Sequence, residues 1–155
     1  MNQTPGVHFP SLPLNMDALA AAIESNSRER KLVLVVDDEP ILLRTIKGWL
    51  DDEFEVTIVN SGEMALHFLQ RGTTDLVLLD YKMPEMDGPT VLWHIRTEKR
   101  TKALPVMFLT AAADRESVLN VVKLKPNGYI LKTKSPEEIK AAVRSFFSER
   151  VIECE

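Results

Sequence analysis

The sequence predicts an α/β fold, in which helices cover both faces of a doubly wound, five-stranded parallel sheet. Two observations lead to this prediction. Five short apolar runs recur along the chain with enough residues between them for a helix, and the intervening segments carry apolar residues at helical spacing. Strands that alternate with helices are joined by right-handed crossovers, which build a parallel sheet covered on both faces.

The predicted strands are continuous apolar runs, which are typical of strands buried on both faces. They span Leu32–Val36, Val56–Val59, Leu76–Leu79, Val106–Leu109 and Tyr129–Leu131. In sheets of this kind the functional site lies outside the carboxyl ends of the strands. The residues that follow each run are therefore the first place to look for function.

Each predicted strand is followed by a segment with the apolar spacing of an amphipathic helix. Ser135 and Glu138 form a capping box at the start of the last helix, and Pro136 suits its first position. The apolar positions of the five helices are Ile41, Leu42, Ile46, Trp49 and Leu50 after Pro40; Met64, Ala65, Phe68 and Leu69; Val91, Leu92 and Ile95 after Gly88 and Pro89; Val118, Leu119 and Val122; and Ile139, Ala142, Val143, Phe146 and Phe147.

The chain divides into a domain over residues 31–150, an extension over residues 1–30 and a short tail over residues 151–155. Three prolines near the start oppose regular structure in the extension, although Met16–Glu24 predicts a short helix that needs a surface to lie on. We interpret the extension as a linker, and a docking or dimerising arm is the alternative.

Composition excludes several classes of function. The 155 residues include 19 Lys and Arg against 23 Asp and Glu, a net charge of -4 that argues against a dedicated nucleic-acid binder. The single cysteine, Cys154, excludes an intramolecular disulfide. No apolar run approaches the ~20 residues needed to cross a bilayer, and the first residues do not resemble a secretory signal. We therefore expect a cytoplasmic protein without membrane contact.

Polar side chains stand at the ends of four of the predicted strands. Asp37 and Asp38 follow the first strand, and Asp80 follows the third. Thr110 ends the fourth strand and Lys132 ends the fifth. Three carboxylates, a hydroxyl and an ammonium from distant parts of the sequence are therefore expected to meet at one edge of the sheet.

The three carboxylates repel one another, by about 4 kcal/mol for two unit charges ~4 Å apart at an effective dielectric constant of ~20. A hard divalent cation such as Mg²⁺ relieves such repulsion. A metal, an ammonium and a hydroxyl around one carboxylate suit a transferring phosphoryl group. In this arrangement Asp80 is the candidate nucleophile, because carboxylates form aspartyl phosphates in several enzymes.

These residues resemble the receiver domain of two-component response regulators. The resemblance covers about residues 31–147 and is carried by Asp37-Asp38, by Asp80 in LVLLDYKMPEMDG, by Thr110-Ala111 in VMFLTA and by Lys132 in YILK. It implies a flavodoxin-like sheet with the strand order 2-1-3-4-5. Each motif alone is commonplace, but their order on successive strands is specific.

The resemblance implies a role for each matching residue. Asp80 is the expected phosphoacceptor, and Mg²⁺ is the expected cofactor, bound by Asp37, Asp38, Asp80 and the backbone carbonyl of Lys82. Lys132 is expected to bind the phosphoryl oxygens, with the N–H of Ala111. Thr110 is expected to move toward the phosphoryl group as Tyr129, the switch aromatic, swings inward.

The same resemblance implies a signalling function. The phosphoryl donor is expected to be a sensor histidine kinase or a histidine phosphotransfer protein. The output is expected to be a protein target, or a larger parent protein, reached through a changed surface; a homodimer is possible. Such a domain promotes its own phosphorylation and dephosphorylation and is not otherwise an enzyme.

Departures from the family pattern leave alternatives open. Thr133 stands where the family usually has proline, so we expect a trans bond after Lys132. The main alternative is a pseudo-receiver, an interaction module that is never phosphorylated. A dehalogenase-like phosphatase would need a second Asp two residues after Asp80, where this chain has Lys82. A flavin-binding module would need a phosphate-cradling Ser/Thr/Gly loop, which no predicted strand end carries.

Overall fold

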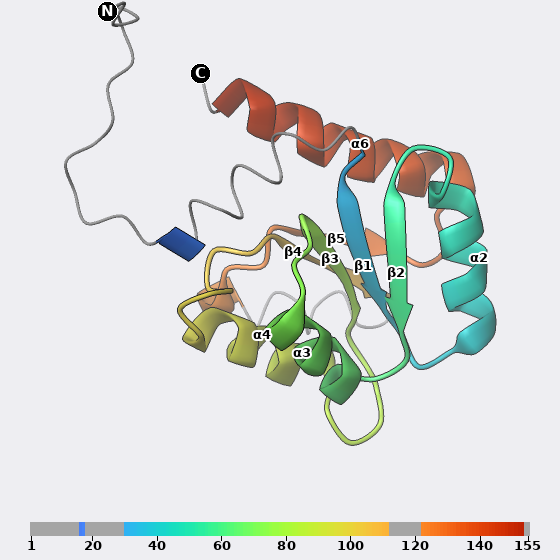
Figure 1. Cartoon of the computed structure of the whole chain (residues 1–155). Coiled ribbons are helices and arrows are strands. Elements are labelled where there is room, and N and C mark those ends of the chain that lie inside the picture. Colours follow the sequence, from blue (N-terminus) through green and yellow to red (C-terminus); the bar gives the residue numbers. More distant parts are fainter. Residues whose placement is uncertain (1–15, 18–29, 112–121, 154–155) are drawn as a thin grey trace, which may run out of the picture.

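The computed structural model describes residues 16–17, 30–111 and 122–153 (Figure 1). Five parallel strands form one sheet in the order β2-β1-β3-β4-β5. The strands are β1 (Leu32–Val36), β2 (Glu55–Val59), β3 (Leu76–Asp80), β4 (Val106–Thr110) and β5 (Gly128–Leu131). The predicted fold class and the strand order implied by the family resemblance are both confirmed.

Helices cover both faces of this sheet (Figure 1). One face carries α2 (Pro40–Leu50) and α6 (Pro136–Glu153), and the opposite face carries α3 (Gly62–Arg71) and α4 (Gly88–Thr97). A 3₁₀ helix, η2 (Val122–Leu124), precedes β5. Within the described residues, no helix combines the length and the apolar character that a bilayer crossing requires.

Two of the predicted helices fall largely outside the described residues. Of the predicted fourth helix, Val118 and Leu119 are not described, and Val122 opens η2 with 60% of its surface exposed. Of the N-terminal helix predicted over Met16–Glu24, only residues 16 and 17 are described, and both are helical.

The alternating side chains of the central strands divide the core into two layers. Val33 and Val35 of β1 pack among residues of α2 and α6, whereas Leu34 and Val36 pack among residues of α3 and α4. All five residues of β3 and of β4 are buried. The continuous apolar runs of the sequence therefore arise because both faces of each central strand are covered.

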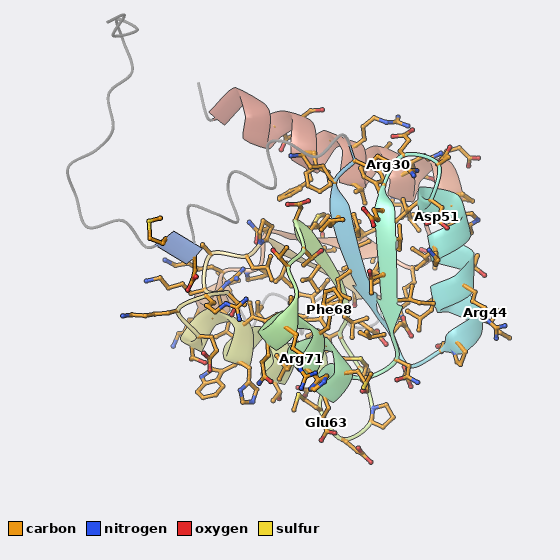
Figure 2. All side chains as sticks on the ribbon, viewed as in Figure 1. Arg30, Arg44, Asp51, Glu63, Phe68 and Arg71 are labelled. Carbon is orange, nitrogen blue, oxygen red and sulfur yellow. The ribbon has the colours of Figure 1, made fainter. Side chains whose placement is uncertain are left out.

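Two residues of the predicted apolar helix faces lie in solvent instead. Ile41 of α2 is 77% exposed and Met64 of α3 is 50% exposed. The buried positions of α2 follow the spacing i, i+3, i+7 over Leu43, Ile46 and Leu50, and Ile41 lies off that stripe. Charged side chains such as Arg71 on α3 occupy the outer helix surfaces (Figure 2).

Serine side chains cap the starts of α3 and α6. Ser61 Oγ accepts a hydrogen bond from Met64 N at 3.1 Å at the start of α3. Ser135 Oγ accepts one from Glu138 N, also at 3.1 Å, which is the bond expected from the predicted capping box. Because α2, α3 and α6 begin soon after β1, β2 and β5, the connections that lead into these helices lie at the carboxyl edge of the sheet.

Neighbouring residues of α4 test the division between its buried and exposed faces. Leu92 is fully buried and Trp93 is 51% exposed. We expect Leu92→Ala to lower the free energy of unfolding by about 2–5 kcal/mol because it leaves a cavity, and Trp93→Ala to lower it by less than about 1 kcal/mol. Urea denaturation measures both, and equal losses would contradict the assignment of the two faces.

Candidate functional site

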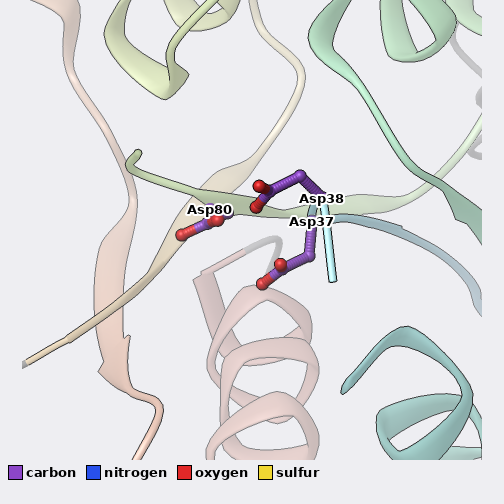
Figure 3. Close-up of side chains that lie close together, drawn as sticks. All are labelled: Asp37, Asp38 and Asp80. Carbon is purple, nitrogen blue, oxygen red and sulfur yellow. The ribbon is translucent and has the colours of Figure 1, made fainter. Parts of the chain in front are cut away.

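Three carboxylates meet where β1 and β3 end side by side. Asp37 and Asp38 follow β1, and Asp80 is the last residue of β3. Each offers an oxygen within 4.8 Å of the others (Figure 3). Asp37 and Asp80 are buried and Asp38 is exposed, so solvent reaches the cluster at Asp38.

Lys132 joins this cluster from β5, on the far side of β4. Its Nζ lies 2.8 Å from Asp37 Oδ2 and 3.0 Å from Asp80 Oδ1. Its backbone N–H donates to Thr110 O at 2.9 Å, which continues the β4–β5 pairing beyond the last strand residue. One ammonium therefore bridges two buried carboxylates, at the edge of the sheet where the sequence predicted that carboxylates and an ammonium would meet.

Burial and mutual repulsion change the ionisation of these groups. Burial raises the pKa of Asp80 to about 7, and the negative charges of Asp37 and Asp38 act in the same direction, while Lys132 opposes them. Burial acts to lower the pKa of Lys132, but its contacts with Asp37 and Asp80 outweigh burial and raise it above the usual range. The lysine therefore stays charged, whereas Asp80 is poised to exchange a proton near neutral pH.

Asp37 shows why the cluster suits a cation. Its Oδ1 accepts a hydrogen bond from Glu39 N at 3.0 Å. Its Oδ2 is buried, and its partner is the ammonium of Lys132 at 2.8 Å. One ammonium leaves an excess of negative charge among the three carboxylates, which fits a hard divalent ion such as Mg²⁺.

The loop after β3 closes over the end of that strand. Gly88 N donates to Tyr81 O at 2.8 Å, and a Cβ at residue 88 would lie 2.4 Å from Asp80 O. Only glycine permits this approach. The sequence predicted only that Gly88 begins a helix; its position shortly after Asp80 is the feature that indicates a closer role.

The other candidate residues differ in their exposure to solvent. Thr110, at the end of β4, is fully buried, and its Oγ1 donates to Ala111 O at 3.1 Å. Ala111 and Lys82 are exposed. Tyr129, on β5, is 37% exposed. The bond between Lys132 and Thr133 is trans, as expected for a residue other than proline.

Comparison with known proteins agrees with this architecture. Residues 33–144 match the family model of the response regulator receiver domain. The chain belongs to this family. It is 35% identical over 121 residues to the chemotaxis protein CheY of Pseudomonas aeruginosa, an alignment that covers 77% of the chain and 97% of that protein. Receiver domains are the phosphoacceptors of two-component signalling.

Other relatives carry similar domains in longer chains. The response regulator Rre1 of Synechocystis is 30% identical over 118 residues, which cover 75% of this chain and 51% of that protein. The sensor histidine kinase TmoS of Ectopseudomonas mendocina is 26% identical over 140 residues, which cover 90% of this chain but 14% of the kinase. Receiver domains of this kind therefore occur both alone and within larger proteins.

Solved structures share the fold. A response regulator from Chloroflexus aurantiacus superposes with a TM-score of 0.71 at 28% identity, covering 77% of this chain and 98% of that structure. CheY4 of Vibrio cholerae superposes with a TM-score of 0.70 at 25% identity, covering 75% of this chain and 98% of that structure.

The raised pKa of Asp80 predicts a pH-dependent stability in metal-free protein. Between the ordinary pKa of 3.8 and about 7, folded Asp80 holds a proton that the unfolded chain has released, so its stabilising contribution is lost as pH rises through about 7. We expect the free energy of unfolding in a chelator to fall by about 1 kcal/mol more between pH 6 and pH 8 in the wild type than in Asp80→Asn. Urea titrations at both pH values measure this difference, and identical pH dependences would show that Asp80 titrates normally.

Proposed function

We propose that this protein is a phosphorylatable receiver domain that accepts a phosphoryl group on Asp80 from a phosphohistidine partner. The observation that carries the proposal is the bridge from Lys132 to Asp37 and Asp80 within a cluster of three carboxylates. In the proposed organisation, residues 31–150 form the receiver domain between an extension over residues 1–30 and a tail over residues 151–155. The family match over residues 33–144 supports these limits.

The proposed reaction is a phosphoryl transfer between two side chains. An oxygen of the Asp80 carboxylate attacks phosphorus, the phosphorus–nitrogen bond of the donor histidine breaks, and its electron pair stays on the imidazole. The product is an acyl phosphate. Attack of water on phosphorus later releases inorganic phosphate and restores the carboxylate, which makes the signal reversible. Burial of Asp80 favours the reaction by excluding competing solvent from the carboxylate.

Asp37, Asp38 and Asp80 would hold Mg²⁺, together with the backbone carbonyl of Lys82. The ligand oxygens lie within 4.8 Å of one another, and a single ammonium is shared between two of the carboxylates; both observations support this assignment. When bound, the ion neutralises the carboxylates and the charge on the transferring phosphoryl group. Asp38, the exposed member of the cluster, lies where solvent and ligands reach it.

The remaining residues receive roles in binding and switching. Lys132 would hold the phosphoryl oxygens with the ammonium that now bridges Asp37 and Asp80. The N–H of Ala111 would supply a further donor, and Thr110 would turn its hydroxyl from Ala111 O toward the phosphoryl group. An inward movement of Tyr129 would then alter the surface around β5.

The proposed partners follow from this chemistry. The donor would be a sensor histidine kinase or a histidine phosphotransfer protein, and the receiver of the signal a protein target or a larger parent protein. The likeness to part of the kinase TmoS supports a role within, or beside, such a phosphorelay. Homodimerisation and a cytoplasmic location belong to the same proposal.

Acetyl phosphate labelling tests the proposed acceptor. We expect the wild type with Mg²⁺ to gain the mass of one phosphoryl group, and Asp80→Asn to gain none, because an amide oxygen forms no stable acyl phosphate. Asp87→Asn is the matched control, since Asp87 lies on the same loop and caps α4 by accepting from Thr90 N at 2.9 Å, a role that asparagine also fills. Intact-protein mass spectrometry reports all three.

The same measurement distinguishes the alternatives. A wild type that gains no mass from acetyl phosphate and does not respond to beryllofluoride would be a pseudo-receiver that acts only through its surface. Labelling that persists in Asp80→Asn would place the acceptor elsewhere. Sustained turnover of phosphate esters would indicate a phosphatase instead of a receiver.

Replacing Lys132 should have opposite effects on two ligands. Its ammonium competes with a cation for Asp37 and Asp80 but attracts a phosphoryl group. We expect Lys132→Met to bind Mg²⁺ about tenfold more tightly and beryllofluoride at least about tenfold more weakly, where tenfold corresponds to ~1.4 kcal/mol. Calorimetry and beryllofluoride-dependent fluorescence measure these affinities.

Lys134→Met is the control for this experiment. Lys134 is exposed and pairs with Glu138 at 3.2 Å, so its removal should leave both affinities near those of the wild type. Weaker Mg²⁺ binding in Lys132→Met would contradict the competition inferred from the two ion pairs.

A further inference from the structure

An arginine side chain forms hydrogen bonds with two loops at the amino edge of the sheet, opposite the acidic cluster. Arg96 lies in the last turn of α4, and its guanidinium donates to five oxygens. The acceptors are Leu124 O at 2.9 Å, Lys102 O at 3.2 Å, Leu104 O at 2.6 Å, Lys125 O at 3.0 Å and Asn127 Oδ1 at 3.2 Å. The first loop, residues 102–104, leads into β4, and the second, residues 124–127, leads into β5. One side chain therefore ties the starts of two neighbouring strands together.

Asn127 continues this connection directly onto β4. Its backbone N–H donates to Val106 O at 2.7 Å, and its side-chain Oδ1 accepts from Val106 N at 2.9 Å. The same Oδ1 also accepts from Arg96. The asparagine side chain thus takes the place of a backbone carbonyl and pairs with the first residue of β4, one position before β5 begins.

The β5 strand depends on such a connection more than the other strands do. It has four residues and lies at the edge of the sheet, paired with β4. The segment before it contains Pro126, which has no N–H to donate. Lys125 in the same segment has a φ of 53°, a left-handed conformation that is costly for a residue with a side chain. Arg96 holds the carbonyl of this strained residue.

The register of β5 determines where Lys132 lies. Parallel strands advance about 3.3 Å per residue, so a slip of two residues would move Lys132 by about 6.6 Å. Its ion pairs of 2.8 and 3.0 Å with Asp37 and Asp80 would then be lost. A slip of one residue would instead turn the buried Ile130 to the opposite face of the strand.

We propose that Arg96 and Asn127 form a register lock, which holds β5 against β4 so that Lys132 reaches the acidic cluster. Both are positioning residues, because neither approaches the carboxylates. The significance of the lock for phosphoryl transfer rests on the function proposed above. The register that it fixes is a property of the metal-free protein and can be tested separately.

Amide hydrogen exchange in chelator tests the lock itself. We expect Arg96→Gln and Asn127→Ala to speed exchange of the Lys132 amide, which is bonded to Thr110 O, at least about tenfold relative to the Asp37 amide, which is bonded to Val59 O at the end of β1. A general loss of stability would accelerate both amides together. Asn127→Asp keeps an acceptor for Val106 N and Arg96, and should restore slow exchange.

Arg100→Gln is the matched control for Arg96→Gln. Arg100 follows the same helix but donates to Gln70 O at 2.8 Å, away from β5. We expect its removal to leave exchange of the Lys132 amide unchanged. If Arg96→Gln fails to fold, Asn127→Ala decides the question, because Asn127 is exposed and its replacement creates no buried cavity.

Ligand binding connects the lock to the site. If Arg96→Gln displaces Lys132, this variant should behave like Lys132→Met and bind Mg²⁺ more tightly and beryllofluoride more weakly than the wild type. General damage to the fold would weaken the binding of both ligands. Adding Arg96→Gln to Lys132→Met should then change neither affinity further.

Unchanged exchange of the Lys132 amide in both Arg96→Gln and Asn127→Ala would overturn the lock. A wild type that fails to bind beryllofluoride would overturn the proposed function, while the exchange experiment would still decide the lock.

Discussion

The main physical constraint on this structure is the balance between the carboxylates and the ammonium at the carboxyl edge of the sheet. Asp37 and Asp80 are buried within reach of each other, and Asp38 adds a third negative charge. Such a cluster is unfavourable unless a cation or a proton compensates it. Lys132 supplies the cation by contacting both buried carboxylates. Burial, together with the charges of Asp37 and Asp38, still raises the pKa of Asp80 against the opposing effect of Lys132, so a further positive ion would stabilise the charged carboxylate.

The topology explains how one lysine comes to serve two aspartates. Asp37 follows β1 and Asp80 ends the adjacent strand β3, while Lys132 follows β5 and reaches across the end of β4. Its position therefore depends on an edge strand, the least supported part of a sheet. Arg96 and Asn127 provide support at the opposite end of that strand. The chemistry at the carboxyl edge and the hydrogen bonds at the amino edge are thus linked through the β4–β5 register.

Much of this arrangement could be predicted from local patterns. The continuous apolar runs predicted buried parallel strands, and the residues that follow these runs predicted that the three aspartates and Lys132 are neighbours. Helix faces were less predictable, because apolar character does not establish burial: Ile41 and Met64 fit the helical spacing yet lie in solvent. The close approach of Gly88 to Asp80 and the hydrogen bonds of Arg96 were not predicted, because neither residue belongs to the acidic cluster or to an apolar stripe.

The sequence alone determined the fold class and the edge of the sheet at which the acidic and basic side chains meet. Strand length, hydrophobic period and chain direction are local properties, so they can be recognised in the sequence. Tertiary structure decided the double ion pair of Lys132, the proton affinity of Asp80, the close contact of Gly88 and the five hydrogen bonds of Arg96. Each depends on distances of a few ångströms between segments remote in sequence, or on how fully those segments exclude water. Such quantities are set by packing, and the sequence pattern carries no measure of them.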